Sequence, residues 1–298
     1  MYGLKQAPLL WNQHINATLS KLGFRRHEGE YGLYFKMCPQ GLVLVALYVD
    51  DLLIAAASTR MVRQVKCQLQ SVYAMKDLGP VNKFLGMNVS QTKDYIALAL
   101  TDYIISAASA SEIQVSKPVY SPLSPTTDYN DSSSPLIADI KQYQAIIGQL
   151  MFIANTGRPD VAYSVSLLSR FMQAPRKVHL RAAHRVFQYL YTTRTHRLVY
   201  RSGSPIQAVI YSDASHGSAA DIPYATRGYI VQMAGGTVTW SSKKIKMVTL
   251  SSTEAEYVAA CEAVKEAAWL THLFTWMGLS PLRTRPLVDN QPDQAHQA

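Results

Sequence analysis

The sequence has few cysteines, few charged residues and no long uninterrupted apolar run. Its 298 residues include three cysteines, Cys38, Cys67 and Cys261, whose separations match no metal-binding spacing and predict reduced thiols in an intracellular protein. The longest apolar run, Leu42–Val49, is well short of the roughly 18 residues that indicate a membrane-spanning helix. The N-terminus has neither a secretory h-region nor the composition of a transit peptide. These absences predict no contact with a membrane and a location in the cytoplasm, the nucleus or both.

Charge is scarce and unevenly placed. Charged residues make up 16% of the chain and hydrophobic residues 48%, which excludes general disorder and provides apolar side chains for about two domain cores. The net charge is +9, and the segment from Ile140 to Arg201 holds ten basic residues and one acid, Asp160, so it carries the whole excess. Aromatic residues are interleaved with the basic ones. This pattern predicts a surface that follows nucleic-acid phosphates, although a solvated helix face would look the same.

The hydrophobic periodicity divides the chain into four segments. Residues 1–116 read as helices and hairpins, and residues 117–139 are rich in proline and serine without a period, which is typical of a tether. Residues 140–201 form the basic segment, with helical periodicity in three pieces that break near Gly157 and at Pro175. Residues 202–298 read as strands followed by a long helix. The elements expected within these segments are helices over 9–22, 58–73 and 251–278, and hairpins over 42–56 and 83–102.

Two adjacent acids interrupt the most apolar part of the chain. Asp50 and Asp51 follow Tyr48 and Val49 at the junction of two β-type runs. At about 4 Å and an effective dielectric constant near 20, two carboxylates repel each other by roughly 4 kcal/mol. Mg²⁺ would relieve this repulsion, because a hard dication accepts carboxylate oxygens and leaves sites open for phosphates. The alternative interpretation is an ordinary hairpin turn that favours aspartate.

A second set of acids lies in the last segment. Asp213 ends a strand-like run, and Asp289 follows the apolar pair Leu287–Val288. Ser251 and Glu254 form a capping box, which predicts a structural role for Glu254. Glu256 differs, because helical steps from it reach only apolar residues: Ala260, Ala263, Ala267, Leu270 and Phe274.

An acid on an apolar stripe needs a metal, a partner or a function. Asp213, Glu256 and Asp289 could therefore converge on paired Mg²⁺ ions that activate water against a phosphodiester. Taken singly, Asp213 is also explained as a turn residue at a strand end, and Asp289 as an ordinary polar residue.

An ordered set of short motifs supports this chemistry. The chain contains YGLKQ at 2–6, YVDD at 48–51, FLG at 84–86, RPD at 158–160 and LSRFM at 168–172. In this order and at these separations, the motifs resemble the reverse transcriptase of copia-type retrotransposon polyproteins. The later segments YSDAS, SSTEAEY and VDNQ resemble the ribonuclease H domain that follows the polymerase in those elements.

The resemblance implies an α+β / α/β fold with four parts: a partial polymerase palm built on an antiparallel hairpin sheet (residues 1–116), the tether (117–139), a basic helical connection (140–201) and an incomplete ribonuclease H-like mixed sheet with a long helix (202–298). It implies two-metal chemistry with Mg²⁺ on template RNA, RNA/DNA hybrid and deoxynucleotides. Asp50 and Asp51 become metal ligands of the palm, with Gln6 and Tyr48 at the nucleotide pocket. Asp213, Glu256 and Asp289 become the ribonuclease H ligands. The basic residues expected to contact nucleic acid are Arg170, Arg176, Lys177, Arg181 and Arg185.

The sequence departs from the family pattern at both ends. The family's remaining polymerase aspartate lies upstream of YGLKQ, and its fourth ribonuclease H acid follows VDNQ, but neither has a match here. We therefore expect a fragment whose polymerase activity is lost. Two alternatives stay open: a non-catalytic protein that binds nucleic acid through its basic segment, and an inactive product of a degenerate reading frame.

Overall fold

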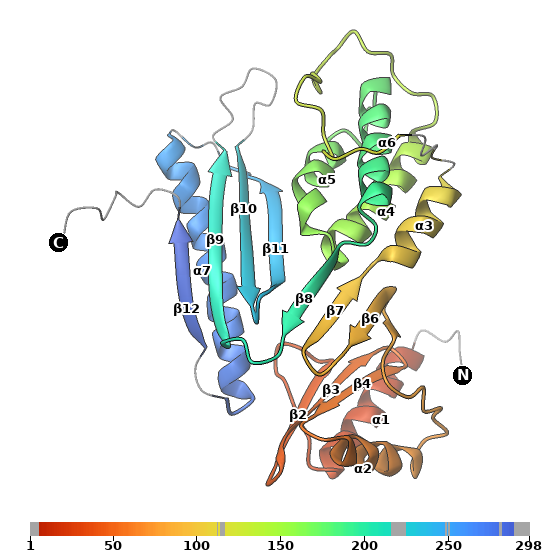
Figure 1. Ribbon diagram of the computed structural model, residues 1–298, viewed down its shortest axis with the longest axis vertical. Coiled ribbons are helices and arrows are strands. Elements are labelled where there is room, and N and C mark those ends of the chain that lie inside the picture. The colour runs from red at the N-terminus through yellow and green to blue at the C-terminus, as the bar shows by residue number, and fades with distance from the viewer. Residues whose placement is uncertain are drawn as a thin grey trace, which may run out of the picture. The chain divides into compact units, whose positions relative to one another are not determined.

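The computed structural model describes residues 6–111, 113, 117–215, 225–247, 249, 251–279 and 282–288. Helices alternate with mostly antiparallel sheets, which confirms the α+β character of the chain (Figure 1). The chain forms two compact units. Unit 1 comprises Met1–Val81 and His272–Pro281, and unit 2 comprises Asn82–Thr271 and Leu282–Ala298. Among the described residues, no helix is both long and apolar enough to cross a membrane.

Unit 1 contains an antiparallel four-stranded sheet with two helices packed on one face. The strands follow the chain in the order β1-β2-β3-β4, and the helices contribute Ile15, Leu19, Val65 and Leu69 to the core beneath Val45. The predicted helices over 9–22 and 58–73 and the hairpin over 42–56 are confirmed. The elements are α1 (Ala7–Lys21), β1 (Arg25–Arg26), β2 (Leu33–Cys38), β3 (Gly41–Tyr48), β4 (Asp51–Ala56) and α2 (Thr59–Gln70).

Unit 2 begins with a small sheet and a cluster of helices. The sheet has the order β5-β6-β7-β8, so β8 joins a strand that lies about a hundred residues earlier in the sequence, with Tyr95 opposite Arg201. The helices α3 to α6 surround the largest described core, which includes Ile147, Leu150 and Phe187. The elements are β5 (Lys83–Phe84), β6 (Met87–Gln91), β7 (Tyr95–Ala99), α3 (Thr101–Ala110), α4 (Ile140–Thr156), the 3-10 helix η1 (Pro159–Val161), α5 (Ala162–Ser169), α6 (Lys177–Thr192) and β8 (Arg197–Arg201).

A mixed sheet and most of a long helix, up to Thr271, complete unit 2. Strands β11, β10 and β9 are antiparallel neighbours, and β12 pairs with β9 in parallel (Figure 1). Helix α7 packs against this sheet, since Ala255 belongs to a small core against which Ala214 of β9 packs. Arg227 of β10 also forms an ion pair with Glu262 of α7 at 3.0 Å. The predicted strands followed by a helix are confirmed. The elements are β9 (Gln207–Ser215), β10 (Thr226–Met233), β11 (Gly236–Lys244), α7 (Ser252–Trp276) and β12 (Arg283–Val288).

A buried arginine ties the helical part of unit 2 together. The side chain of Arg158 is 2% exposed and binds Asp160 through two bonds, from Nε to Oδ1 at 2.9 Å and from Nη2 to Oδ2 at 2.7 Å. The same guanidinium donates to the carbonyl and hydroxyl oxygens of Thr193 at the end of α6, and the hydroxyl of Tyr189 donates to Asp160 at 2.7 Å. Arg158 was counted in the predicted phosphate-following surface. Its charge is instead neutralised inside the fold.

Removing this arginine is expected to destabilise unit 2. Arg158→Met leaves the Asp160 carboxylate without its cationic partner and the Thr193 carbonyl without its donor, and breaking a buried ion pair in this way costs roughly 3–5 kcal/mol. Because Asp160 is 33% exposed, we expect a smaller loss, about 2–4 kcal/mol of unfolding free energy. Urea denaturation followed by circular dichroism measures it. Lys141→Met, at an exposed position of α4, is the matched control, and an equal loss in both variants would contradict the assignment.

The same network predicts a pH dependence. Burial by itself raises the pKa of Asp160, but the hydrogen bonds and charge of Arg158, with the Tyr189 hydroxyl, outweigh it and hold the pKa below the ordinary 3.8. The ionised form therefore stabilises the fold above pH 3.8, and this contribution is lost as the pH falls through the lowered pKa. We expect Asp160→Asn to flatten the decline in the free energy of unfolding below about pH 4. Identical acid profiles for the wild type and the variant, measured by urea titration at several pH values, would refute this.

Candidate functional site

The YVDD segment forms the tip of the β3–β4 hairpin. Tyr48 pairs with Asp51, so Val49 and Asp50 are the two residues of the loop. Tyr48 is 57% and Val49 65% exposed, and both aspartates are exposed. The tip therefore presents two acids and two uncovered hydrophobic side chains to solvent.

The two carboxylates have no internal partner. Within the described part of the chain, no hydrogen bond or ion pair is formed by the carboxylate of Asp50 or of Asp51. Two neighbouring carboxylates with free oxygens are the donor set that a hard divalent cation takes. The residues present therefore fit a Mg²⁺ ion, and an ion there would offset the repulsion between them.

The loop adopts a strained backbone. Val49 has a φ of 55°, in the left-handed region that β-branched residues avoid, at a cost of about 1–3 kcal/mol. In a two-residue hairpin loop, a positive φ at the first position alone is typical of a type II′ turn, which favours glycine there. Such strain persists only where neighbouring groups determine the conformation, and it often marks a functional site.

Gln6, predicted to contact a nucleotide, directly precedes α1. Its backbone carbonyl accepts a hydrogen bond from the amide of Leu10 at 3.0 Å, and its side chain makes no capping bond. The residue is exposed, so its amide is available to a ligand. Its role at a nucleotide pocket stays a prediction.

Two of the three predicted ribonuclease H acids, Asp213 and Glu256, lie among the described residues. Asp213 lies opposite Gly228 of β10 and is exposed, whereas its neighbours Ser212 and Ala214 face the side that α7 covers. Strand alternation therefore places Asp213 on the face away from α7. Glu256 is half-buried near the start of α7, and Asp289 lies outside the described residues. Among the described side chains, no group of three or more His, Cys, Asp or Glu residues is placed to hold a metal.

The predicted stripe of α7 needs a correction at both ends. The buried residues are Ala255, Ala259, Ala263, Ala267 and Leu270. Ala263, Ala267 and Leu270 of the predicted stripe are buried, whereas Glu256, Ala260 and Phe274 are half-buried. Towards the N-terminus the buried residues continue in steps of four, so Glu256 and Ala260 each lie one position beside them. The cap was predicted correctly in part, since the amide of Glu254 donates to Ser251 Oγ at 3.1 Å.

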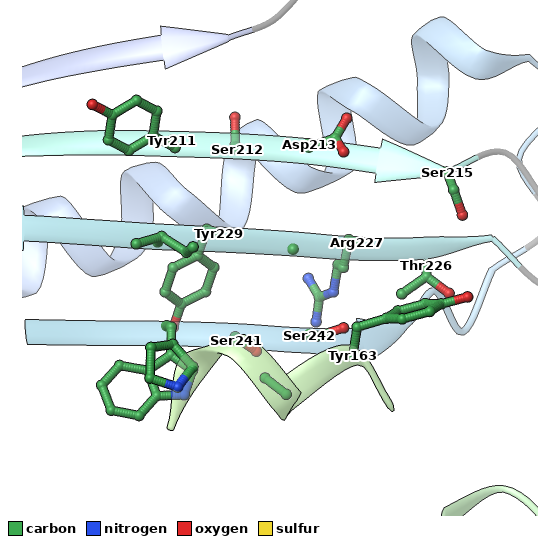
Figure 2. Close-up of a pocket in the computed structure, with 15 residues that line it drawn as sticks. Tyr163, Tyr211, Ser212, Asp213, Ser215, Thr226, Arg227, Tyr229, Ser241 and Ser242 are labelled. Atoms are coloured by element: carbon green, nitrogen blue, oxygen red, sulfur yellow. The ribbon is translucent and has the colours of Figure 1, made fainter. Parts of the chain in front are cut away.

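Asp213 borders a groove in unit 2. The groove has a volume of about 710 Å³ and runs between strands β9 to β11 and the η1–α5 helices, with Asp213 on one wall and Tyr163 on the other (Figure 2). Beside it, Arg170 donates from Nη2 to the hydroxyl of Thr226 at 2.9 Å, while its Nε and Nη1 are buried without a described partner. This burial lowers the pKa of Arg170. Local patterns did not predict Tyr163 at this groove, because the contact joins elements distant in sequence.

The five basic residues predicted to contact nucleic acid differ in exposure. Lys177 and Arg181 are exposed on neighbouring turns of α6, and with His184 they line a groove of about 670 Å³. Arg176 is engaged elsewhere, since it donates to the carbonyl oxygens of Ser132 and Ser134 in the tether at 2.9 and 2.6 Å. Those that are half-buried are Arg170, Arg176 and Arg185.

Comparisons with known proteins agree with the ordered motifs. Residues 1–125 match the reverse transcriptase (RNA-dependent DNA polymerase) family. The putative transposon Ty5-1 protein of Saccharomyces cerevisiae is 55% identical over 268 residues, which cover 89% of this chain and 87% of that protein. The Pol polyprotein from transposon RE1 of Arabidopsis thaliana is 32% identical over 288 residues, and that from transposon TNT 1-94 of Nicotiana tabacum is also 32% identical over 288 residues.

The two polyproteins are much longer than this chain. The matches cover 97% and 94% of this chain but 19% and 22% of the respective polyproteins. The chain belongs to the copia-type retrotransposon Pol family, whose reverse transcriptases are enzymes that act on nucleic-acid templates and use divalent metal ions. It is similar to one portion of those longer Pol polyproteins.

Proposed function

We propose that the chain carries part of a polymerase palm and a ribonuclease H domain, which act by two-metal phosphoryl transfer on template RNA and RNA/DNA hybrid. The observation that carries the proposal is the pair of exposed, unpartnered carboxylates at the tip of the β3–β4 hairpin, in a segment that matches the reverse transcriptase family. Asp50 and Asp51 would hold Mg²⁺ in the palm, with Gln6 and Tyr48 at the nucleotide pocket. Asp213, Glu256 and Asp289 would hold it in the ribonuclease H domain.

Bound Mg²⁺ would supply charge stabilisation for a phosphoryl group in transfer and would activate the attacking oxygen. The chain's own residues would position the nucleic acid: exposed Tyr48 offers an aromatic face, and Lys177 and Arg181 offer charges to the backbone phosphates. For its location we propose the cytoplasm, the nucleus or both.

A second candidate is a nucleic-acid-binding protein without catalysis. Strand alternation favours it, since Asp213 lies on the face of the sheet away from α7, on which Glu256 is carried. Both candidates share the basic face of α6, and they differ only in whether the acids work together.

Cleavage of the RNA strand in a labelled RNA/DNA hybrid distinguishes the two candidates. If the ribonuclease H acids act, purified protein with Mg²⁺ cleaves the strand, and Asp213→Asn reduces the rate at least about a hundredfold while hybrid binding is kept. Asp94→Asn, at an exposed turn position, is the control and should cleave like the wild type. A folded wild type that binds hybrid and cleaves nothing would contradict ribonuclease activity and favour the binding protein. A chain that does not fold would contradict both.

The basic face of α6 predicts salt-dependent binding. Log affinity falls as log salt rises, and each lost phosphate contact reduces the magnitude of this slope by about 1. The double variant Lys177→Ala, Arg181→Ala should therefore reduce the magnitude by roughly 1–2. Fluorescence anisotropy with a labelled hybrid measures this slope. The matched control is Arg60→Ala with Arg63→Ala on α2, where both side chains are also exposed. Equal slopes in the two double variants would refute a specific role for α6.

A further inference from the structure

The tip of the β3–β4 hairpin is held by a residue from another element. The indole Nε1 of Trp11, on α1, donates a hydrogen bond to the carbonyl oxygen of Val49 at 2.6 Å. Val49 is the residue with the positive φ, so the bond fixes the peptide unit that links it to Asp50. Of the described side chains, Trp11 is the one that makes a hydrogen bond to this loop.

Trp11 is itself held in place. Its ring lies edge-on to the ring of Tyr73, with centroids 5.4 Å apart and planes at 74°. The hydroxyl of Tyr73 shares hydrogen bonds with Thr18 Oγ1 at 2.7 Å and His14 Nδ1 at 2.8 Å. The indole therefore meets the loop from a packed framework formed by α1 and the segment that follows α2.

The strand before the loop is also fixed. The amide of Leu47 donates to the carbonyl of Gly32 at 2.7 Å, and a Cβ at Gly32 would lie 2.6 Å from the Leu47 carbonyl oxygen. Only glycine permits this approach. The contact with Gly32 fixes β3 up to Leu47, and the hydrogen bond from Trp11 fixes Val49. The backbone between them therefore has little freedom, and this backbone determines the orientation of Asp50 and Asp51.

We infer that Trp11 is a positioning residue for a divalent cation at Asp50 and Asp51, an inference that rests on the proposed function. Its indole N–H keeps Val49 in a conformation that valine does not adopt readily, and this conformation fixes the backbone that carries the two carboxylates. Without the bond, Val49 relaxes to a negative φ, the peptide before Asp50 rotates, and the Asp50 carboxylate changes its direction relative to Asp51. Trp11 acts through the loop and contacts no cation.

Titration of the full chain with Mn²⁺, followed by electron paramagnetic resonance, tests the inference. The Mn²⁺ binding that belongs to this site is the part that the double variant Asp50→Asn, Asp51→Asn abolishes. Trp11→Phe keeps an aromatic ring against Tyr73 and removes only the N–H donor. We therefore expect the affinity for Mn²⁺ at this site to fall about threefold to tenfold. Trp269→Phe, which removes an exposed indole from α7, is the matched control and leaves it unchanged.

A second substitution separates positioning from general stability. Glycine adopts a positive φ without strain, so Val49→Gly should preserve the loop without help from the indole. We expect Trp11→Phe with Val49→Gly to bind Mn²⁺ like the wild type, even if Trp11→Phe alone lowers the melting temperature. This rescue also covers the case in which Trp11→Phe alone does not fold.

The outcomes distinguish the inference from the function on which it rests. If Asp50- and Asp51-dependent binding is present and Trp11→Phe leaves it unchanged, the role of Trp11 is refuted while the cation site stands. If Trp11→Phe weakens binding and Val49→Gly does not restore it, the loop mechanism is refuted. If the wild type shows no such binding, the proposed cation site and the role of Trp11 both fail.

Discussion

The arrangement of unit 1 depends on one constraint: the hairpin that carries the adjacent acids Asp50 and Asp51 turns through a loop of only two residues, Val49 and Asp50. Such a loop needs a positive φ at its first position, and the chain places valine there, where glycine would be unstrained. The remaining features compensate. Trp11 binds the loop carbonyl, Tyr73 supports Trp11, and Gly32 lets the backbone approach β3 closely. Residues far apart in sequence thus maintain a local conformation that the loop would not keep alone.

Unit 2 uses its positive charge in two ways. Arg158 neutralises Asp160 inside the fold and joins η1 to the end of α6, while Arg176 fastens the tether to the start of α6. Lys177 and Arg181 are left exposed on the same helix. The basic segment looks uniform in sequence, but its residues have two roles. Arg158 and Arg176 form hydrogen bonds within the fold, whereas Lys177 and Arg181 are available to bind phosphates. Guanidinium groups suit the first role, because their planar donors satisfy several acceptors at once.

Local patterns predicted much of the fold. The β3–β4 hairpin, the three helical pieces that break near Gly157 and Pro175, and helix α7 were all legible, because each depends on periodicity and on stop signals within a short window. Helix α3 was missed, as was the pairing of β7 with β8, which joins residues about a hundred positions apart. The acids at 50 and 51 were singled out from their apolar surroundings, and their role as metal ligands stays a prediction. The burial of Arg158 and the contact of Trp11 with Val49 were not predicted, since tertiary packing decides both.

The central claim is that a strained loop held by Trp11 forms a divalent-cation site at Asp50 and Asp51. Crystals of the full chain grown with Mn²⁺, with diffraction data collected at the manganese absorption edge, test it most directly. We expect an anomalous difference peak within about 2.5 Å of oxygens from both carboxylates, with Val49 at a positive φ and the Trp11 indole on its carbonyl. A loop with Val49 at a negative φ, or no manganese peak between these carboxylates, would contradict the claim.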